Sequence, residues 1–420
     1  MAELIDLKEL QEKVILAAVS TTDGDGAEAS LDELEELAST AGAVTVGRVI
    51  QNRESIHPGT YLGKGKLDEV REMLMDLGAT GIICDDELSP AQLRNLEDAL
   101  DTKVMDRTMV ILDIFASRAN TREGKIQVEL AQLRYRAIRL VGMRNSLSRL
   151  GGGIGTRGPG EKKLETDRRL IHQRIGQLKG ELESVKRHRE VTRQQREKNF
   201  ALTAAIVGYT NAGKSTLLNR LTGAGILAED KLFATLDPTT RSFLLSDGQQ
   251  ILLTDTVGFI RKLPHHLIDA FKSTLEEARY SDIILHVVDC SNPQMDMQMH
   301  VVKETLKDLE IVDKTVITVF NKTDRLEENG GPSMIPRDFS SDYQVRISAK
   351  TGQGLEDLEE ILKTIIRSRR VYLEKVYPYS QTGRIQTIRK YGQLLEEEYR
   401  EDGVAVKAYV PAELFAGLYE

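Results

Sequence analysis

One stretch of the chain combines the residue types that hold a phosphate. Residues 208–215, Gly208-Tyr209-Thr210-Asn211-Ala212-Gly213-Lys214-Ser215, fit the pattern Gly-x-x-x-x-Gly-Lys-Ser/Thr. An apolar, strand-like run precedes them, and a helix-like run starting at Thr216 follows. Glycines let backbone N–H groups surround a phosphate, and a helix N-terminus adds a positive dipole. We therefore expect a phosphate-binding loop (P-loop) rather than a plain Gly-rich turn. Lys214 would reach the β- and γ-phosphates, and the Ser215 hydroxyl would ligate Mg²⁺.

Three further segments, each after a strand-like run, indicate which nucleotide is bound. In Asp255-Thr256-Val257-Gly258, the carboxylate could hold Mg²⁺ through water and the glycine N–H could sense a γ-phosphate. In Asn321-Lys322-Thr323-Asp324, the ionised Asp324 could accept both donors of the guanine edge, which adenine lacks. Ser348-Ala349-Lys350 would offer backbone N–H groups to the guanine O6. Four motifs in this order predict a domain over residues 199–368 that binds GTP and GDP.

A GTPase also needs a switch loop with a threonine that contacts Mg²⁺ and the γ-phosphate. The segment Phe233-Ala234-Thr235-Leu236-Asp237-Pro238-Thr239-Thr240 lies between the P-loop and Asp255. It contains three threonines, Thr235, Thr239 and Thr240, and spacing alone does not choose among them.

The fold class expected from the whole chain is α/β with several domains. Residues 1–112 alternate predicted strands (14–19, 43–47 and 81–84) with amphipathic helices, which indicates a small α/β domain with a parallel sheet. Within it, Gly63-Lys64-Gly65-Lys66 could bind phosphate, although a flexible basic turn is the favoured alternative. Residues 369–420 predict strands 371–377 and 403–410 with a helix near 383–392, a small α+β domain of unassigned role.

The region 113–198 is predicted to be a basic helical linker. The chain has a net charge of −8, yet residues 118–198 contain 21 Lys/Arg and 9 Asp/Glu, a local balance of +12 that leaves −20 for the rest. Apolar residues at helical spacing predict two long helices packed as a hairpin: 126, 130, 133, 138 and 140, then 164, 170, 175, 178, 182 and 185.

A Gly-rich loop, residues 150–160, joins these two predicted helices. It is flanked by basic residues: Arg144, Arg149, Arg157, Lys162 and Lys163. Its tip either approaches an RNA surface closely or is a solvated connector, and we favour the first.

Composition indicates a cytoplasmic protein, which we expect to be a monomer. The sequence has no apolar run of membrane-span length, and its acidic start is unlike a signal peptide. Cys84 and Cys290 lie in strand-like runs and suggest neither a metal site nor a disulfide framework.

Several of these segments together resemble the HflX family of translation-factor-class GTPases. They are residues 208–215 with Asn211, 233–239, 255–259 and the Gly-rich stretch 149–163, and the resemblance extends from about residue 40 to at least 368. It implies an N-terminal α/β domain, a helical linker, a Ras-like GTPase domain and a C-terminal α/β piece. It also implies binding to the RNA and proteins of the large ribosomal subunit, and splitting of stalled or idle ribosomes as GTP becomes GDP and phosphate.

The resemblance further assigns roles to residues. It selects Thr235 as the switch threonine, and therefore as the Mg²⁺ ligand beside Ser215, with Lys214, Thr235 and Gly258 as the catalytic set. It implies ATP binding by the N-terminal domain, and with it ATP hydrolysis, without fixing residues. The alternative function is a GTP-dependent switch for an RNA-modifying enzyme or a signalling partner, which would not require the basic linker.

Two positions bear on how GTP is cleaved. Many GTPases place a water-orienting Gln directly after the Asp-x-x-Gly motif, whereas this chain has Phe259 there. We therefore expect slow intrinsic hydrolysis, activated by the ribosome or by a K⁺ ion. Asn211 could place a side-chain carbonyl beside such an ion, or it could merely brace the P-loop.

Overall fold

The computed structural model describes residues 11–21, 26–150, 159–197, 202–223, 225, 232–264, 275–328 and 337–419. The chain forms two compact units. The first comprises Met1–Val185, Glu229–Asp237 and Ile260–Ser273, and the second comprises Lys186–Ala228, Pro238–Phe259 and Thr274–Glu420. The Gly-rich tip of the linker, residues 151–158, lies outside the described residues.

A parallel sheet forms the centre of the first unit. Its strands are β1 (Lys13–Ser20), β2 (Val44–Asn52), β3 (Gly81–Cys84) and β4 (Lys103–Asp106), in the order β2-β1-β3-β4. All three pairings are parallel, as predicted. The strand order reverses beside β1, so the sheet has a switch point between the carboxyl ends of β1 and β3, where open α/β sheets bind ligands.

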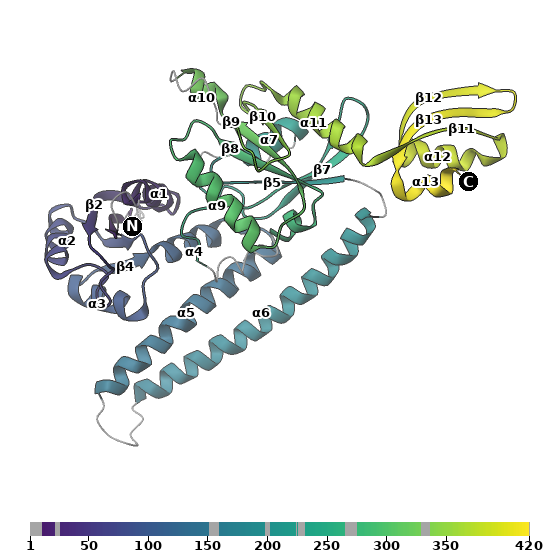
Figure 1. Ribbon diagram of the computed structural model, residues 1–420. Helices are drawn as coiled ribbons and strands as arrows, with labels where there is room; N and C mark the ends of the chain where they lie inside the picture. Colours follow the sequence, from purple (N-terminus) through teal and green to yellow (C-terminus); the bar gives the residue numbers. More distant parts are fainter. Residues whose placement is uncertain are drawn as a thin grey trace, which may run out of the picture. The chain divides into compact units, whose positions relative to one another are not determined.

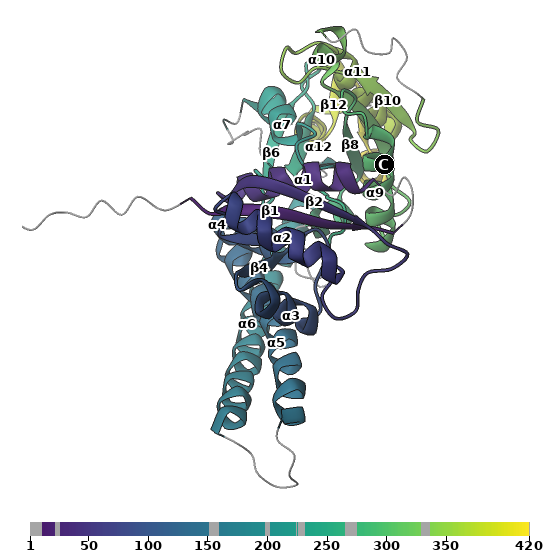
Figure 2. The same ribbon diagram turned by 90° about the vertical axis from the view of Figure 1, so that its left-hand side faces the viewer.

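Helices cover both faces of this sheet. Figure 2 shows α1 (Ala27–Thr40) and α2 (Lys64–Asp76) on opposite sides of β1 and β2. The α2 face also carries α3 (Pro90–Leu100), which begins with a Ser89–Gln92 capping box and has Pro90 at its first position. Neither β4 nor α4 (Arg107–Arg118) was predicted, and α4 runs across the expected 112/113 boundary.

The basic linker is a helical hairpin, as predicted. Its helices α5 (Arg122–Leu150) and α6 (Pro159–Glu197) run side by side in Figures 1 and 2. Ile126 and Leu130 of α5 pack against Ile175 and Leu178 of α6, and Arg174 also donates to the Glu129 carboxylate between the two helices. The expected apolar faces were partly wrong: Ile138 and Leu170 are each 54% exposed.

The second unit contains a six-stranded sheet in the order β10-β9-β8-β5-β7-β6. The strands are β5 (Leu202–Gly208), β6 (Thr239–Leu244), β7 (Gln250–Asp255), β8 (Ile283–Asp289), β9 (Thr315–Asn321) and β10 (Tyr343–Arg346). Only β6 is antiparallel to its neighbour. The helices that accompany this sheet include α7 (Lys214–Thr222), α9 (Met295–Asp308), α10 (Thr323–Glu328) and α11 (Leu355–Ser368).

Along the buried strands, successive side chains point to opposite faces of this sheet. One face of β8 and β9 packs with α7 and α11 in the main core. The other face includes Val288 and Phe320, which pack with α9. All four predicted motifs follow the carboxyl ends of parallel strands, so they meet at one edge of the sheet.

The C-terminal segment of the second unit forms a three-stranded antiparallel sheet with helices on one face. Strand β11 (Arg370–Tyr377), helix α12 (Thr382–Tyr391) and strand β13 (Gly403–Pro411) match the prediction. Strand β12 (Gln393–Arg400) and helix α13 (Ala412–Tyr419) were not predicted. The sheet order is β11-β13-β12, with Leu373, Ile388 and Val406 in its core.

In the described part of the chain, no helix has the length and apolarity needed to cross a membrane. Both cysteines, Cys84 and Cys290, are buried free thiols.

Candidate functional site

The P-loop has the strand–turn–helix context that its pattern predicted, between β5 and α7. Two of its glycines are required by close contacts. A Cβ on Gly208 would lie 2.3 Å from the Val287 carbonyl oxygen, and one on Gly213 would lie 2.3 Å from Asn321 Nδ2. Gly213 also has a φ of 95°, which other residues rarely adopt. The loop is thereby held against β8 and β9, with the N-terminus of α7 at its end.

Lys214 lies buried inside this loop. Its ammonium donates to the carbonyl oxygens of Tyr209 (2.8 Å) and Gly208 (3.3 Å). Burial lowers the pKa of Lys214 to about 8, and the nearby Asp255 only partly opposes this shift. A phosphate would favour the charged ammonium, so the lysine is suited to an anionic ligand.

Ser215 and Asp255 bring oxygen ligands together beside the loop. The Ser215 hydroxyl donates to Asp255 Oδ2 at 2.7 Å. Hydroxyl and carboxylate oxygens are the hard ligands that Mg²⁺ prefers, usually with phosphate and water completing its shell. These residues therefore fit a nucleotide-bound Mg²⁺. Thr256 fixes the strand end by donating from its hydroxyl to the Ile206 carbonyl at 2.8 Å.

The Asp-x-x-Gly segment lies directly against the P-loop. The Phe259 N–H donates to the Gly208 carbonyl (3.1 Å), and the Phe259 carbonyl accepts from the Thr210 N–H (2.8 Å). A Cβ on Gly258 would lie 2.8 Å from Thr210 Cγ2 and 2.9 Å from Lys214 Nζ. Only glycine fits this position, which lies beside the P-loop lysine. Val257 is buried next to it.

Asn321 connects the two halves of the proposed nucleotide site. Its Nδ2 donates to the Ala212 carbonyl of the P-loop, and its Oδ1 accepts from the Ala349 N–H, both at 2.9 Å. Asp324 accepts from the Ser348 hydroxyl at 2.6 Å, and the Ser348 side chain is fully buried. The predicted guanine-reading segments therefore come together.

Two neighbours complete this side of the site. Thr323 donates from its N–H to the Ile347 carbonyl, and Lys350 is exposed. Lys322 pairs with Asp289 at 2.8 Å. Sequence reasoning missed Asp289, although its position at the end of the apolar run 283–288 was a usable signal.

Residues 233–237 of the switch segment belong to the first unit, whereas residues 238–240 and the other motif residues belong to the second. Phe233 and Leu236 are buried, while Ala234 and Thr235 are partly exposed in irregular backbone. Thr239 and Thr240 lie in β6, and the Thr240 hydroxyl is 2.9 Å from that of Thr254 on β7. Strand pairing restrains those two threonines, which favours Thr235 as the switch threonine.

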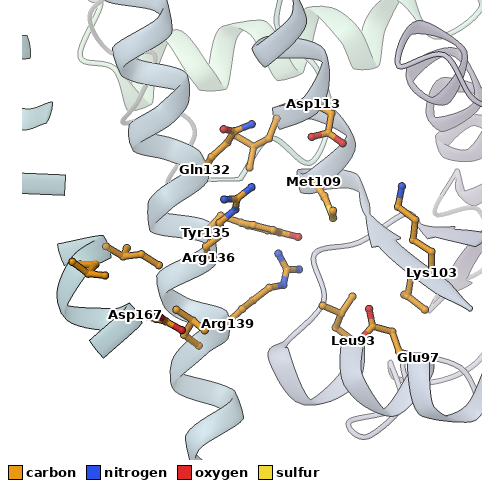
Figure 3. A pocket seen from close by; sticks show the side chains of 15 residues that line it. Leu93, Glu97, Lys103, Met109, Asp113, Gln132, Tyr135, Arg136, Arg139 and Asp167 are labelled. Carbon is orange, nitrogen blue, oxygen red and sulfur yellow. The ribbon is translucent and has the colours of Figure 1, made fainter. Parts of the chain in front are cut away.

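A separate cavity of about 630 Å³ lies in the first unit (Figure 3). Its walls come from α3, β4, α4, α5 and α6, and its lining mixes apolar side chains with charges of both signs. Asp106 accepts from the Tyr135 hydroxyl (2.6 Å) and from Arg139 (2.7 Å), so these two lining side chains are held by that carboxylate. Leu170, which the hairpin core does not bury, also lines the cavity.

The second phosphate-binding candidate, Gly63–Lys66, forms the start of α2. The Gly63 N–H donates to Gln51 Oε1 at 2.7 Å, and Lys66 pairs with Glu69 within the helix. A helix N-terminus of this kind carries a partial positive charge, and within the unit its Gly63 N–H is bonded to Gln51 and its Lys66 ammonium to Glu69.

Comparisons with known proteins agree with the geometry. Three family models match in succession: GTP-binding GTPase N-terminal over residues 28–116, GTP-binding GTPase Middle Region over 118–196, and 50S ribosome-binding GTPase over 203–322. A GTPase HflX of Lacrimispora saccharolytica is 76% identical over 418 residues, which cover 100% of this chain and 98% of that protein. A GTPase HflX of Escherichia coli is 42% identical over 407 residues, covering 97% and 95%.

One solved structure is also similar, with lower identity. It is a GTP-binding protein from the archaeon Sulfolobus solfataricus in complex with GDP, 24% identical, with a TM-score of 0.44. The match covers 84% of this chain and 98% of that one.

Proposed function

The chain belongs to the HflX family of GTPases, and from this premise we propose that it binds GTP at the described site, hydrolyses it, and acts on the large ribosomal subunit. The main support for a nucleotide at this site comes from the hydrogen bonds of the Asn321 side chain. One amide side chain joins the phosphate-binding loop to the loop that would face the base, so the two half-sites form one binding surface.

On this proposal each side chain has a defined task. Asp324, held by Ser348, accepts from the guanine edge, and the N–H groups of Ala349 and Lys350 face the guanine O6. Lys214 turns from the P-loop carbonyls to the β- and γ-phosphates. The Gly258 N–H contacts the γ-phosphate from the opposite side.

Ser215 and Thr235 would hold Mg²⁺ directly, and Asp255 would hold it through water. When bound, this ion neutralises charge that develops on the phosphates. Lys214 contributes in the same sense by placing its ammonium on the transferred phosphoryl group. Phe259 supplies no group to orient water, so we propose that hydrolysis is slow until an outside partner orders the site. K⁺ beside Asn211 is a further proposed source of positive charge.

Ribosome binding is supported by the basic linker and by the description of the matching family model. The +12 charge of residues 118–198 can neutralise RNA phosphates. We propose that the hairpin tip contacts ribosomal RNA and that GTP binding drives subunit separation. A protein with this task works in the cytoplasm.

Sucrose gradients of ribosomes test this function. We expect the protein with a non-hydrolysable GTP analogue to cosediment with large subunits and to reduce the amount of intact ribosomes. Replacing Arg149, Arg157, Lys162 and Lys163 with Ala should flatten the dependence of log affinity on log salt, by roughly 0.7 to 0.9 for each RNA phosphate that is no longer neutralised. It should leave GTP binding intact. Copurification with a single enzyme or signalling protein, and not with ribosomes, would favour the alternative function.

We also propose, from the family resemblance, that the N-terminal domain binds and hydrolyses ATP. Competition of ATP with a labelled ATP analogue, in the presence of saturating GTP, measures it separately from the guanine site. Binding that disappears with excess GTP would assign the ATP signal to the guanine site.

A further inference from the structure

The turn that would face the nucleotide base has a strained backbone. Residues 321–324 lead from the end of β9 into the start of α10, and Lys322 in this turn has a φ of 66°. This left-handed conformation is unfavourable for a residue that carries a Cβ, and it persists where the surrounding structure enforces it. The contacts that enforce it here come from the end of the neighbouring strand, β8.

The first of these contacts fixes the entry to the turn. Strands β8 and β9 are parallel neighbours, and Asp289 at the end of β8 is in register with Asn321 at the end of β9. The next residue, Cys290, donates to the Asn321 carbonyl from its N–H at 3.1 Å and from its thiol at 2.9 Å. The backbone just before Lys322 is therefore tied to the residue that follows Asp289.

The second contact holds the side chain of Lys322. Its ammonium lies 2.8 Å from Asp289 Oδ2, and the two side chains are only 14% and 12% exposed. An ion pair this well covered differs from an exposed surface pair, because removal of one partner leaves the other charge poorly solvated and without compensation. The pair should therefore keep the lysine in one place.

Asp289 is itself fixed, so it is a rigid point of attachment. Its Oδ1 accepts from the Ser291 N–H at 3.0 Å and from the Ser291 hydroxyl at 2.6 Å. Both carboxylate oxygens thus have partners, one within the loop after β8 and one in the turn after β9. The carboxylate cannot follow a movement of Lys322 without breaking its bonds to Ser291.

The held turn lies between the two parts of the proposed guanine site. On one side of Lys322, the Asn321 side chain bonds to Ala212 and Ala349. On the other side, Asp324 accepts from the Ser348 hydroxyl. The direction in which Asp324 points therefore depends on the backbone conformation at Lys322, which determines how α10 leaves β9.

From these contacts we propose that Asp289 is a positioning residue for the nucleotide base. By holding the Lys322 ammonium, it keeps the turn in the conformation in which Asp324 faces the base. This inference rests on the proposed function, in which Asp324 accepts from the guanine edge. Asp289 does not touch the nucleotide itself and acts through Lys322.

The competing interpretation is that Asp289 only closes its own turn with Ser291. Asp289→Asn separates the two, because an amide oxygen can still accept from Ser291 but the charge that holds Lys322 is lost. Lys322→Met breaks the same ion pair from the other side and keeps an unbranched side chain of similar length.

The matched control is Asp282→Asn, just before the other end of β8. Asp282 accepts from the N–H and hydroxyl of Thr203, both at 2.9 Å, and pairs with Arg369 at 2.9 Å. It therefore has the same kinds of partner as Asp289, at the end of the strand away from the nucleotide motifs.

The measurement is the affinity of the full chain for GDP and for pyrophosphate, each by competition with a labelled GDP. Both ligands occupy the phosphate site, but only GDP presents a base. We expect Asp289→Asn and Lys322→Met each to weaken GDP binding about tenfold, as the strained turn relaxes and the binding-competent population falls. Their affinity for pyrophosphate should stay unchanged, and Asp282→Asn should change neither affinity.

The double variant shows whether the two residues act as one unit. If Asp289 acts through Lys322, Asp289→Asn combined with Lys322→Met should also lose about tenfold, whereas independent effects would multiply to about a hundredfold. A hundredfold loss, unchanged GDP affinity in both single variants, or an equal loss for pyrophosphate would each overturn this inference. Wild-type protein that binds GDP no more tightly than pyrophosphate would instead overturn the proposed guanine site.

Discussion

The lowered pKa of Lys214 predicts that nucleotide binding takes up a proton. In the protein alone the ammonium has a pKa of about 8, because burial removes it from water. Bound phosphate favours the charged form and should raise the pKa to the ordinary value or above. Below pH 8 the lysine is already charged and binding needs no proton. Above pH 8 the free protein loses the charge that the phosphate requires, so affinity should fall as pH rises.

The size of this effect can be calculated from the two pKa values. If the bound value is at least the ordinary 10.5, affinity for GDP should fall about tenfold between pH 7 and pH 9, and about 0.9 proton should be taken up at pH 9. Titration with a fluorescent nucleotide gives the affinities, and calorimetry in buffers of different ionisation enthalpy gives the protons. Lys214→Arg is the control, because an arginine stays charged over this pH range. Any pH dependence that comes from ionisation of the guanine base is the same in this variant and in the wild type. A change below about twofold, or the same slope in Lys214→Arg, would refute the reasoning.

Three further predictions address the base, the cation and acid stability. Asp324→Asn should weaken GTP binding by about a hundredfold through loss of two charge-assisted hydrogen bonds, and should allow xanthine nucleotides to bind. Competition binding of GTP, ATP and XTP measures both effects. An unchanged preference for GTP would show that Asp324 is not part of the site. Ribosome-stimulated turnover should be faster in potassium than in sodium, and Asn211→Ala should abolish the difference, whereas equal rates in both salts would leave Asn211 as a P-loop brace. His286 is buried with its pKa lowered from 6.5 to about 4, so its neutral form is the folded one and stability is lost as pH falls below 6.5. Urea unfolding should show a loss of about 2 kcal/mol from this residue between pH 7 and pH 5, which His286→Leu should remove.

The motifs of the candidate nucleotide site could be located in the sequence because each is a short contiguous pattern at a strand end. Gly208, Asp255 and Asn321 lie where parallel strands terminate, and such ends meet at one edge of the sheet. Strands β1, β2 and β3 of the N-terminal sheet were predicted in the same way, from local apolar runs. Its last strand was missed because β4 has only four residues and its helix α4 follows without a turn signal.

Pairings between residues distant in sequence were the part that local patterns could not predict. Asp237 binds Thr121, 116 residues away, and Lys262 binds Asp85, 177 residues away. The separation of each pair in the sequence follows no recurring pattern. In the sequence alone, Asp237, Lys262 and Asp85 look like ordinary charged residues on the protein surface. The wrong assignment of Leu170 has a similar cause, because helical periodicity does not tell which neighbour a face meets.

The environment of Phe259 supports activation of hydrolysis from outside the GTPase domain. Its side chain is 2% exposed, and its backbone N–H and carbonyl both bond to the P-loop, at Gly208 and Thr210. The buried phenyl ring of Phe259 has no donor or acceptor with which to orient a water molecule. The water must then be oriented by a group that arrives with a partner. If that partner is the ribosome, as proposed above, turnover would be confined to the bound complex.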